Sequence, residues 1–164
     1  MFDIVKEKTA SFSGHRNLSH SILSISTEVE KEIRRQYELG VTTFLCGMAI
    51  GFDMLCGEAV LNLKKELKNL KLVAVIPCVS QANAYPAREK ERYDRLKEHA
   101  DKIVFTSENY SFDCMFKRNR FLIDNSAVCI CYLLKASGGT FYTVNYANSR
   151  DIPIIDIRPK ECYL

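Results

Sequence analysis

The stretch LCGMAIGFD, residues 45–53, joins an apolar run to a helical pattern through two glycines that lie four residues apart. Glycine readily adopts positive φ and lets a ligand approach the backbone, and the first turn of a helix leaves its N–H groups free. These donors and the helix dipole favour a phosphate or another anion. The spacing differs from the G-x-G-x-x-G fingerprint of dinucleotide-binding domains. We therefore expect a strand, a turn and a helix, with Gly47 and Gly51 beside an anion.

Apolar runs and helical patterns alternate outward from this stretch in both directions. Strands are expected at 9–13, 41–46, 72–77, 102–106, 127–134 and 152–157. Helices are expected at 21–39, 52–67, 86–99 and 140–149, with a further helix capped by Asp113. This alternation predicts an α/β fold, a three-layer Rossmann-like domain with a mostly parallel sheet of about six strands and helices on both faces. Because we find no repeat and no linker, residues 1–164 are expected to form a single domain.

The composition restricts the function. A net charge of +3 is too small to indicate a nucleic-acid-binding protein by itself. Seven cysteines are an odd number, and Cys46, Cys78, Cys129 and Cys131 lie on expected strands, which favours buried free thiols over disulfides. Cysteines and histidines lack metal-ligand spacing, so no metal is expected. With no signal-peptide pattern and no apolar run near the ~20 residues of a membrane span, we expect a cytoplasmic protein without a membrane partner.

Two further segments lie at the edge of the expected sheet where ligands bind. Ser13-Gly14-His15-Arg16 ends the first strand, and the planar guanidinium of Arg16 suits a phosphate or carboxylate. Ser137-Gly138-Gly139-Thr140 follows the most apolar strand and supplies hydroxyls, flexible backbone and the start of a helix. In parallel sheets, ligands lie beyond the carboxyl ends of the strands. We expect both segments to bind the anion; a tight turn and an ordinary strand-to-helix loop are the alternatives.

A polar residue interrupts the apolar side of the helix that follows Asp113. Asn119 shares that side with Phe116 and Leu122, and a buried amide needs a hydrogen-bond partner. Asn119 therefore either holds a neighbouring glycine loop or contacts the ligand. Arg118 and Arg120 flank this side and either bind the anion or point to water.

Four more residues are candidates for contacts with a nucleotide. Asp53 lies in the first turn of its helix, where it acts either as a cap or as an acceptor for ribose hydroxyls. Glu58 faces either the ligand edge or solvent. Gln81 and Tyr85 lie on the expected loop 78–85 and could cover the base or the ribose.

These motifs together resemble the SLOG superfamily, a Rossmann-like group that includes the DNA-processing proteins (Smf/DprA) and the Lonely Guy enzymes. Residues 46–53 resemble the DprA pattern SG-x-A-x-GID, and 118–123 resemble its RNR-I-I segment. Ser137-Gly138 with Thr143 and Ala147 is similar to its SG-x-x-x-TA-x-x-A pattern.

The resemblance extends furthest, from about residue 9 to 157, to the YpsA-like family of small bacterial proteins. The shared residues are Ser13-Gly14-His15-Arg16, Gly51-Phe52-Asp53, Pro77, Gln81, Arg118-Asn119, Asp124, and Gly138-Gly139-Thr140 with Tyr142-Thr143. It implies a Rossmann-like fold and a pocket for a nucleotide or nucleotide-derived ligand, without an established reaction.

The resemblance to the Lonely Guy enzymes is incomplete. Those enzymes cleave a nucleoside monophosphate to base and ribose 5-phosphate, using an arginine and the glutamates of PGG-x-GT-x-EE. Arg118 is similar to that arginine, but Phe141, Tyr142 and Thr143 follow Gly139-Thr140 where the glutamates are expected. Glycosidic hydrolysis would therefore need Glu58 or Asp53.

Three functions follow as hypotheses. The first is a cytosolic sensor or adaptor that binds a nucleotide derivative. Its expected ligand-binding residues are Ser13, Gly14, His15, Arg16, Gly47, Gly51, Asp53, Gln81, Arg118, Asn119, Ser137, Gly138, Gly139 and Thr140. The second is a nucleotide N-glycosidase whose catalytic candidates are Arg118, Glu58 and Asp53.

The third hypothesis is single-stranded DNA binding by analogy with DprA, through His15, Arg16, Lys117, Arg118 and Arg120. The modest charge argues against a nucleic-acid partner, and so does the lack of aromatic residues interleaved with a basic stripe. Neither observation excludes such a partner. The sequence makes no cofactor certain; the expected ligand is a nucleotide or a phosphorylated nucleoside. The sequence also leaves the oligomeric state open, with a homo-oligomer as one outcome.

Overall fold

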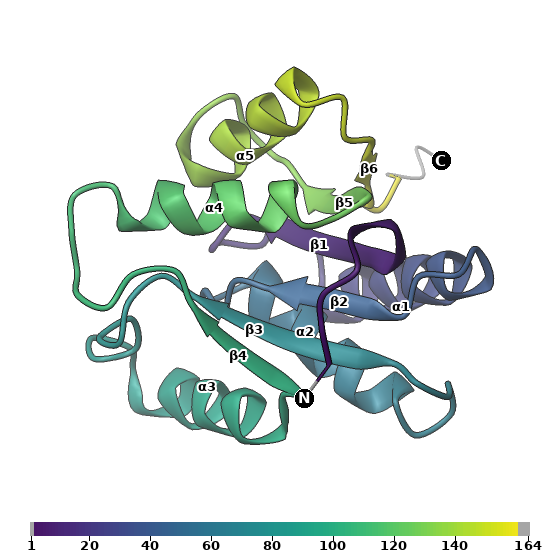
Figure 1. Ribbon diagram of the computed structural model, residues 1–164, viewed down its shortest axis with the longest axis horizontal. Coiled ribbons are helices and arrows are strands. Elements are labelled where there is room, and N and C mark those ends of the chain that lie inside the picture. Colours follow the sequence, from purple (N-terminus) through teal and green to yellow (C-terminus); the bar gives the residue numbers. More distant parts are fainter. Residues whose placement is uncertain (1, 161–164) are drawn as a thin grey trace.

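The structure is a computed structural model that describes residues 2–160 (Figure 1). The strands are β1 (Thr9–Gly14), β2 (Thr43–Cys46), β3 (Lys71–Ile76), β4 (Lys102–Phe105), β5 (Val128–Tyr132) and β6 (Ile154–Asp156). The α-helices are α1 (Ile22–Glu38), α2 (Phe52–Leu63), α3 (Ala87–His99), α4 (Cys114–Asp124) and α5 (Gly138–Ser149), and a 3-10 turn, Lys6–Lys8, precedes β1.

All six strands pair in parallel, in the order β4-β3-β2-β1-β5-β6. The chain runs outward from β1 to β4 and then crosses back to β5 on the other side of β1. The topological switch point therefore lies between β1 and β5, whose carboxyl ends are level because Gly14 pairs with Tyr132. The expected three-layer α/β fold is confirmed.

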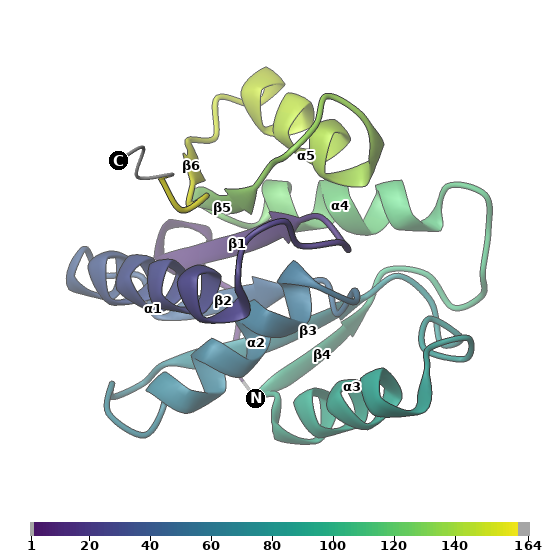
Figure 2. The ribbon, with the colours of Figure 1, turned by 180° about the vertical axis from the view of Figure 1, so that it is seen from behind.

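Helices cover both faces of the sheet (Figures 1 and 2). On one face α2 packs between α1 and α3, and on the other α4 packs against α5. Side chains alternate along each strand: Phe44 of β2 joins the core under α1 and α2, whereas its neighbour Leu45 joins Leu122 of α4 on the opposite face. Both faces of the central strands are therefore buried, as a parallel sheet requires.

Some boundaries differ from the expected ones. The helix expected at 52–67 ends at Leu63, because hydrogen-bonded turns replace the helix there. Strand β3 ends at Ile76, so Cys78 lies in a turn and its placement on a strand was wrong. Helix α5 begins at Gly138, two residues earlier than expected, which makes the whole glycine pair part of its first turn.

Helix α4 differs in which side chains it buries. Phe116 was expected on the buried side, but its side chain is 37% exposed. Asn119 and Leu122 are buried as expected, and Cys114 and Arg118 are buried in addition. The residue before the helix does not cap it through its side chain, because the carboxylate of Asp113 accepts a hydrogen bond from Ser111 Oγ at 3.0 Å. Asp113 thus occupies the position before the helix, as expected, but without a capping hydrogen bond from its side chain.

Six cysteines are unpaired and buried, as expected, and the seventh, Cys162, lies outside the described residues. Within residues 2–160, no helix combines the length and the hydropathy that a membrane span needs. The same range contains no group of three or more His, Cys, Asp or Glu side chains arranged to hold a metal ion.

Candidate functional site

A cavity of about 770 Å³ lies at the carboxyl edge of the sheet, beside the switch point. Segments from distant parts of the chain converge on it: the end of β1, the turn before α2, helix α4 and the first turn of α5. Ten of the expected site residues line it: Ser13, Gly14, His15, Arg16, Asp53, Arg118, Asn119, Gly138, Gly139 and Thr140. Tyr85, expected to cover a base or ribose, lines it as well.

The turn before α2 touches the segment after β1 through its backbone. Gly51 has φ +92°, and a Cβ at this position would lie 2.2 Å from the carbonyl oxygen of Arg16. One residue later, the backbone N–H of Phe52 donates to the carbonyl oxygen of His15 at 3.2 Å. Only glycine combines that φ with so close an approach. Gly51 thus brings the turn before α2 against the Arg16 backbone, and it does not itself line the cavity.

Arg118 reaches inward from α4 rather than to water. Its side chain is buried, Nη1 donates to the carbonyl oxygen of Gly47, and Nε donates to Oδ1 of Asn119 at 2.8 Å. Gln81 Nε2 donates to the same Gly47 carbonyl at 2.9 Å. Gly47 and Gln81 therefore form the support of the cavity floor and are not part of its lining. Arg120, in contrast, donates to the hydroxyl of Tyr142 at 2.9 Å.

Asp53 is buried in the first turn of α2, close to Arg118. Burial raises the pKa of its carboxyl to about 6, against the opposing effect of the Arg118 charge. Its Oδ2 accepts from the backbone N–H of Ala49 at 3.4 Å, so it holds the preceding turn rather than the free N–H groups of its own helix. A carboxyl with this pKa changes charge near neutral pH.

His15 occupies the cavity wall with an unsatisfied ring nitrogen. Its side chain is only 9% exposed, and among residues 2–160 its buried Nε2 has no hydrogen-bond partner. Burial lowers the pKa of this imidazole, and the nearby charge of Lys135 lowers it further. A buried polar atom without a partner costs about 1–3 kcal/mol. An imidazole with a lowered pKa and one buried, unpaired nitrogen therefore lines the cavity.

The first turn of α5 contributes backbone to the cavity as well. Gly138 and Gly139 are exposed there, and Thr140 is buried. Asn119 reaches this turn, because a Cβ on Gly139 would lie 3.7 Å from its Nδ2. Asn119 thus contacts the glycine loop and also lines the cavity, which fits both of its expected roles. Ser137 is the exposed residue before the helix and does not line the cavity.

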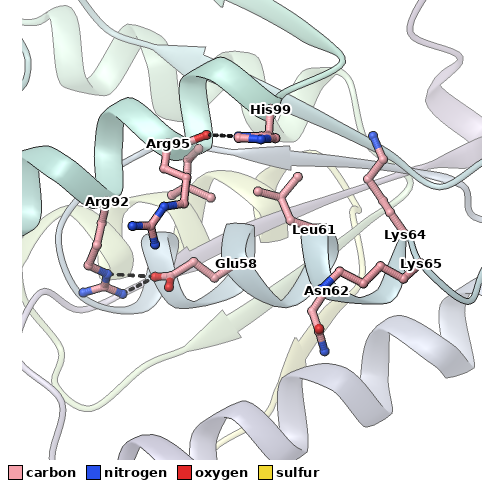
Figure 3. A pocket seen from close by; sticks show the side chains of 9 residues that line it. Glu58, Leu61, Asn62, Lys64, Lys65, Arg92, Arg95 and His99 are labelled. Carbon is pink, nitrogen blue, oxygen red and sulfur yellow. Dashed lines mark hydrogen bonds and ion pairs between the residues drawn. The ribbon is translucent and has the colours of Figure 1, made fainter.

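Glu58 lies apart from the other candidates, in a second hollow of about 410 Å³ between α2 and α3 (Figure 3). Its carboxylate accepts from Arg92 Nε at 2.9 Å and pairs with Nη2 of the same side chain. The structure does not bring Glu58 together with Arg118. Asp53 is consequently the one acidic residue among those that line the large cavity.

Sequence reasoning missed several lining residues. Lys135 follows β5 and was not singled out as a candidate, although it lines the cavity. Because it lies two residues before Ser137, the sequence already placed it at the carboxyl edge of the sheet, where ligands bind. Phe112 and Met115 lie where the chain enters α4, in a segment without periodicity, and gave no signal. Phe116 was assigned to the core.

Comparison with known proteins identifies the chain's relatives. A UPF0398 protein of Oceanobacillus iheyensis is 25% identical over 143 residues, covering 84% of this chain and 77% of the relative. A UPF0398 protein of Bacillus pumilus is 28% identical over 137 residues, covering 81% and 74%. The UPF0398 protein YpsA of Bacillus subtilis is 26% identical over 114 residues, covering 68% and 63%.

Solved structures share the fold. DNA processing protein A of Helicobacter pylori, described for its single-stranded DNA binding mode, superposes with a TM-score of 0.64 at 16% identity over 91% of this chain. DNA processing protein A of Streptococcus pneumoniae gives a TM-score of 0.61 at 19% identity over 90% of this chain. The chain spans 64% and 50% of those two proteins. At these identities the likeness establishes the fold alone.

The family model YpsA, described as a SLOG family, matches residues 12–158, which include every segment that meets at the cavity. The chain therefore belongs to the YpsA family of the SLOG superfamily.

Proposed function

We propose that the large cavity binds a nucleotide or another phosphorylated nucleoside derivative, and that the protein acts as a sensor or adaptor for it. The observation that carries the proposal is the convergence of cationic side chains, a helix N-terminus and an unsatisfied imidazole on one cavity. A volume of about 770 Å³ suits a ligand of nucleotide size.

The phosphate would lie at the first turn of α5. The N–H groups of a helix's first turn are free, and the helix dipole favours an anion there. Two exposed cations, Arg16 and Lys135, line the same cavity and add charge. Arg118 contributes its charge as well, while its hydrogen bond to the Gly47 carbonyl ties α4 to the turn before α2 and its bond to Oδ1 orients the neighbouring Asn119.

The ribose and the polar edge of the base would contact the remaining polar groups. Asp53 offers oxygen acceptors for hydroxyls, and the unsatisfied Nε2 of His15 gains a partner from any ligand donor or acceptor that reaches it.

Nucleotide N-glycosidase activity is a second candidate, favoured by the single observation that Asp53 and Arg118 share the cavity. A carboxyl with its pKa raised to about 6 can exchange a proton near neutral pH. Glu58 cannot exchange a proton with a ligand in this cavity, because it pairs with Arg92 outside the cavity lining. Release of free base from nucleoside monophosphates, lost in Asp53→Asn, would establish this activity; a flat time course at high protein concentration would remove it.

Thermal denaturation with a ligand panel tests the binding proposal. The panel contains nucleoside monophosphates, a nicotinamide dinucleotide, ribose 5-phosphate and a single-stranded oligodeoxynucleotide. A ligand at 100 times its Kd adds about 2.7 kcal/mol to stability, which is easily detected. We expect a phosphorylated nucleoside to raise the Tm. No shift from any of them would contradict the proposal, and a shift from the oligodeoxynucleotide alone would replace it with DNA binding.

A matched pair of lysine variants locates the binding site. Lys135 lines the cavity, whereas Lys117 is also exposed but lies on α4 outside the cavity lining. We expect Lys135→Ala to reduce the ligand-induced Tm shift and Lys117→Ala to leave it unchanged. Equal effects of the two variants would mean that the ligand responds to overall charge rather than to this cavity.

A further inference from the structure

An apolar lip, formed by Phe112, Met115 and Phe116, borders one side of the large cavity. It belongs to the start of α4 and the loop that leads into it, which extends beyond the sheet in Figure 1. The three side chains are 95%, 41% and 37% exposed, respectively. Large apolar side chains that gather in the exposed rim of a polar cavity are typical of ligand contacts.

The lip is partly fixed in place. The ring of Phe116 packs edge to face on Tyr142 of α5, with centroids 4.6 Å apart and planes at 61°. Tyr142 is itself held by the hydrogen bond from Arg120. Phe116 therefore keeps a defined orientation at the start of α4, beside the turn of α5 where the phosphate is proposed to lie. Phe112, in contrast, is almost fully in water.

We propose that this lip stacks on the base of the ligand, with Phe112 covering the base against Phe116 and Met115. The inference rests on the proposed function and specifies its ligand: a nucleotide that carries an aromatic base, not a sugar phosphate. Continuity with the cavity selects this occupant, because the apolar lip and the polar groups at His15 and α5 border the same space. One molecule with a phosphate and a planar ring complements both.

Stacking of the base on the lip would add to the affinity that the phosphate contacts provide. A base on an aromatic side chain contributes about 5- to 150-fold in affinity. Stacking depends little on which base is present, because every base has a π face. The lip is thus expected to distinguish nucleotides from ribose 5-phosphate and to discriminate weakly among bases.

The chain contains no tryptophan, which makes a direct test available. Phe112→Trp introduces a single tryptophan at the lip, which can be excited selectively over the eight tyrosines, and Phe105→Trp introduces one at an exposed phenylalanine of β4 that does not line the cavity. We expect a nucleoside monophosphate to change the emission of Phe112→Trp in a saturable way and to leave that of Phe105→Trp unchanged. Ribose 5-phosphate should leave both unchanged.

Affinity measurements complete the test. Phe112→Ser should weaken nucleoside monophosphate binding about 5-fold or more and leave ribose 5-phosphate binding unchanged. Tyr110→Ser changes an exposed aromatic of the same loop outside the cavity lining and should alter neither. The serine substitution at a 95% exposed position is not expected to prevent folding.

The outcomes separate the two proposals. If nucleotides bind the wild type, but Phe112→Trp emission is unchanged and Phe112→Ser binds as tightly, the stacking inference is overturned and the proposed function stands. If no phosphorylated nucleoside binds the wild type, the proposed function itself fails. Equal binding of ribose 5-phosphate and nucleotide would also overturn the inference.

Discussion

The phenolic oxygen of Tyr132 lies 2.7 Å from Nδ1 of His20, at the point where the segment after β1 crosses the end of β5. The same oxygen accepts from the backbone N–H groups of Ser19, at 3.1 Å, and His20, at 3.3 Å. Its ring is fully buried and stacks on Phe52 at the start of α2, with centroids 5.6 Å apart. One side chain thus links β5, α2 and the segment that carries His15 and Arg16.

Tyr132→Phe should therefore weaken the contacts that hold the segment after β1, while the aromatic ring stays in the core. The ring stays, but two backbone N–H groups lose their acceptor, which costs about 1–3 kcal/mol in the free energy of unfolding. Urea denaturation measures the loss. Tyr37→Phe is the control, because its hydroxyl donates to the Lys68 carbonyl at an exposed site and should cost less. Equal losses in the two variants would contradict this role of Tyr132.

Gly51→Ala tests the contact between the turn before α2 and the Arg16 backbone. Alanine is strained at φ +92°, and its Cβ would meet the Arg16 carbonyl at 2.2 Å. Gly40→Ala is a matched control, because Gly40 has φ +99° with nothing within 4 Å of a Cβ. We expect the control to lose about 1–2 kcal/mol from backbone strain alone. Gly51→Ala should lose clearly more in urea denaturation, and similar losses would show that the close approach is unimportant.

The layers of the fold, and the segments that border the large cavity, could be predicted from the sequence. Alternating strands and helices imply a parallel sheet, and a parallel sheet places all strand carboxyl ends at one edge. That is why Ser13–Arg16, Asp53 and Gly138–Thr140 could be grouped before any coordinates were known, and all of them line the cavity. Their role in binding stays a prediction.

Side-chain direction could not be predicted in the same way. Arg118 and Arg120 look equivalent in the sequence, yet α4 turns one toward the Gly47 carbonyl and the other toward Tyr142. Burial of a guanidinium depends on acceptors from another segment, which local periodicity does not reveal. For the same reason the sequence did not reveal that Gln81 donates to the Gly47 carbonyl and that neither residue lines the cavity. Their assignment to the ligand stays a prediction.

The free energy of unfolding should depend on pH through the ionisation of Asp53. Its pKa is raised to about 6 in the folded state from 3.8, so the folded state binds the proton more tightly. Ionisation of Asp53 therefore lowers the free energy of unfolding as the pH rises from about 4 to about 6, and this loss persists at higher pH. His15, whose pKa is lowered from 6.5, acts in the opposite direction, since acid favours its unfolded, protonated form.

Comparison with Asp53→Asn isolates the aspartate. Subtracting the unfolding free energies of the variant from those of the wild type cancels His15 and every other unchanged group. The difference should fall between about pH 4 and pH 6 and stay flat above that range. A difference that rises with pH would mean that the Arg118 charge, not burial, dominates the environment of this carboxyl.

Arg118→Lys tests whether the planar guanidinium holds the cavity floor. A lysine keeps the charge but cannot donate in one plane to both the Gly47 carbonyl and Asn119 Oδ1. We expect a loss of about 1–3 kcal/mol in unfolding free energy and a smaller ligand-induced Tm shift. Arg120→Lys, which disturbs only the Tyr142 hydroxyl, should cost less than about 1 kcal/mol. A fully retained ligand response in Arg118→Lys would show that only the positive charge at this position matters, because the turn before α2 and Asn119 would then keep their places without the planar guanidinium.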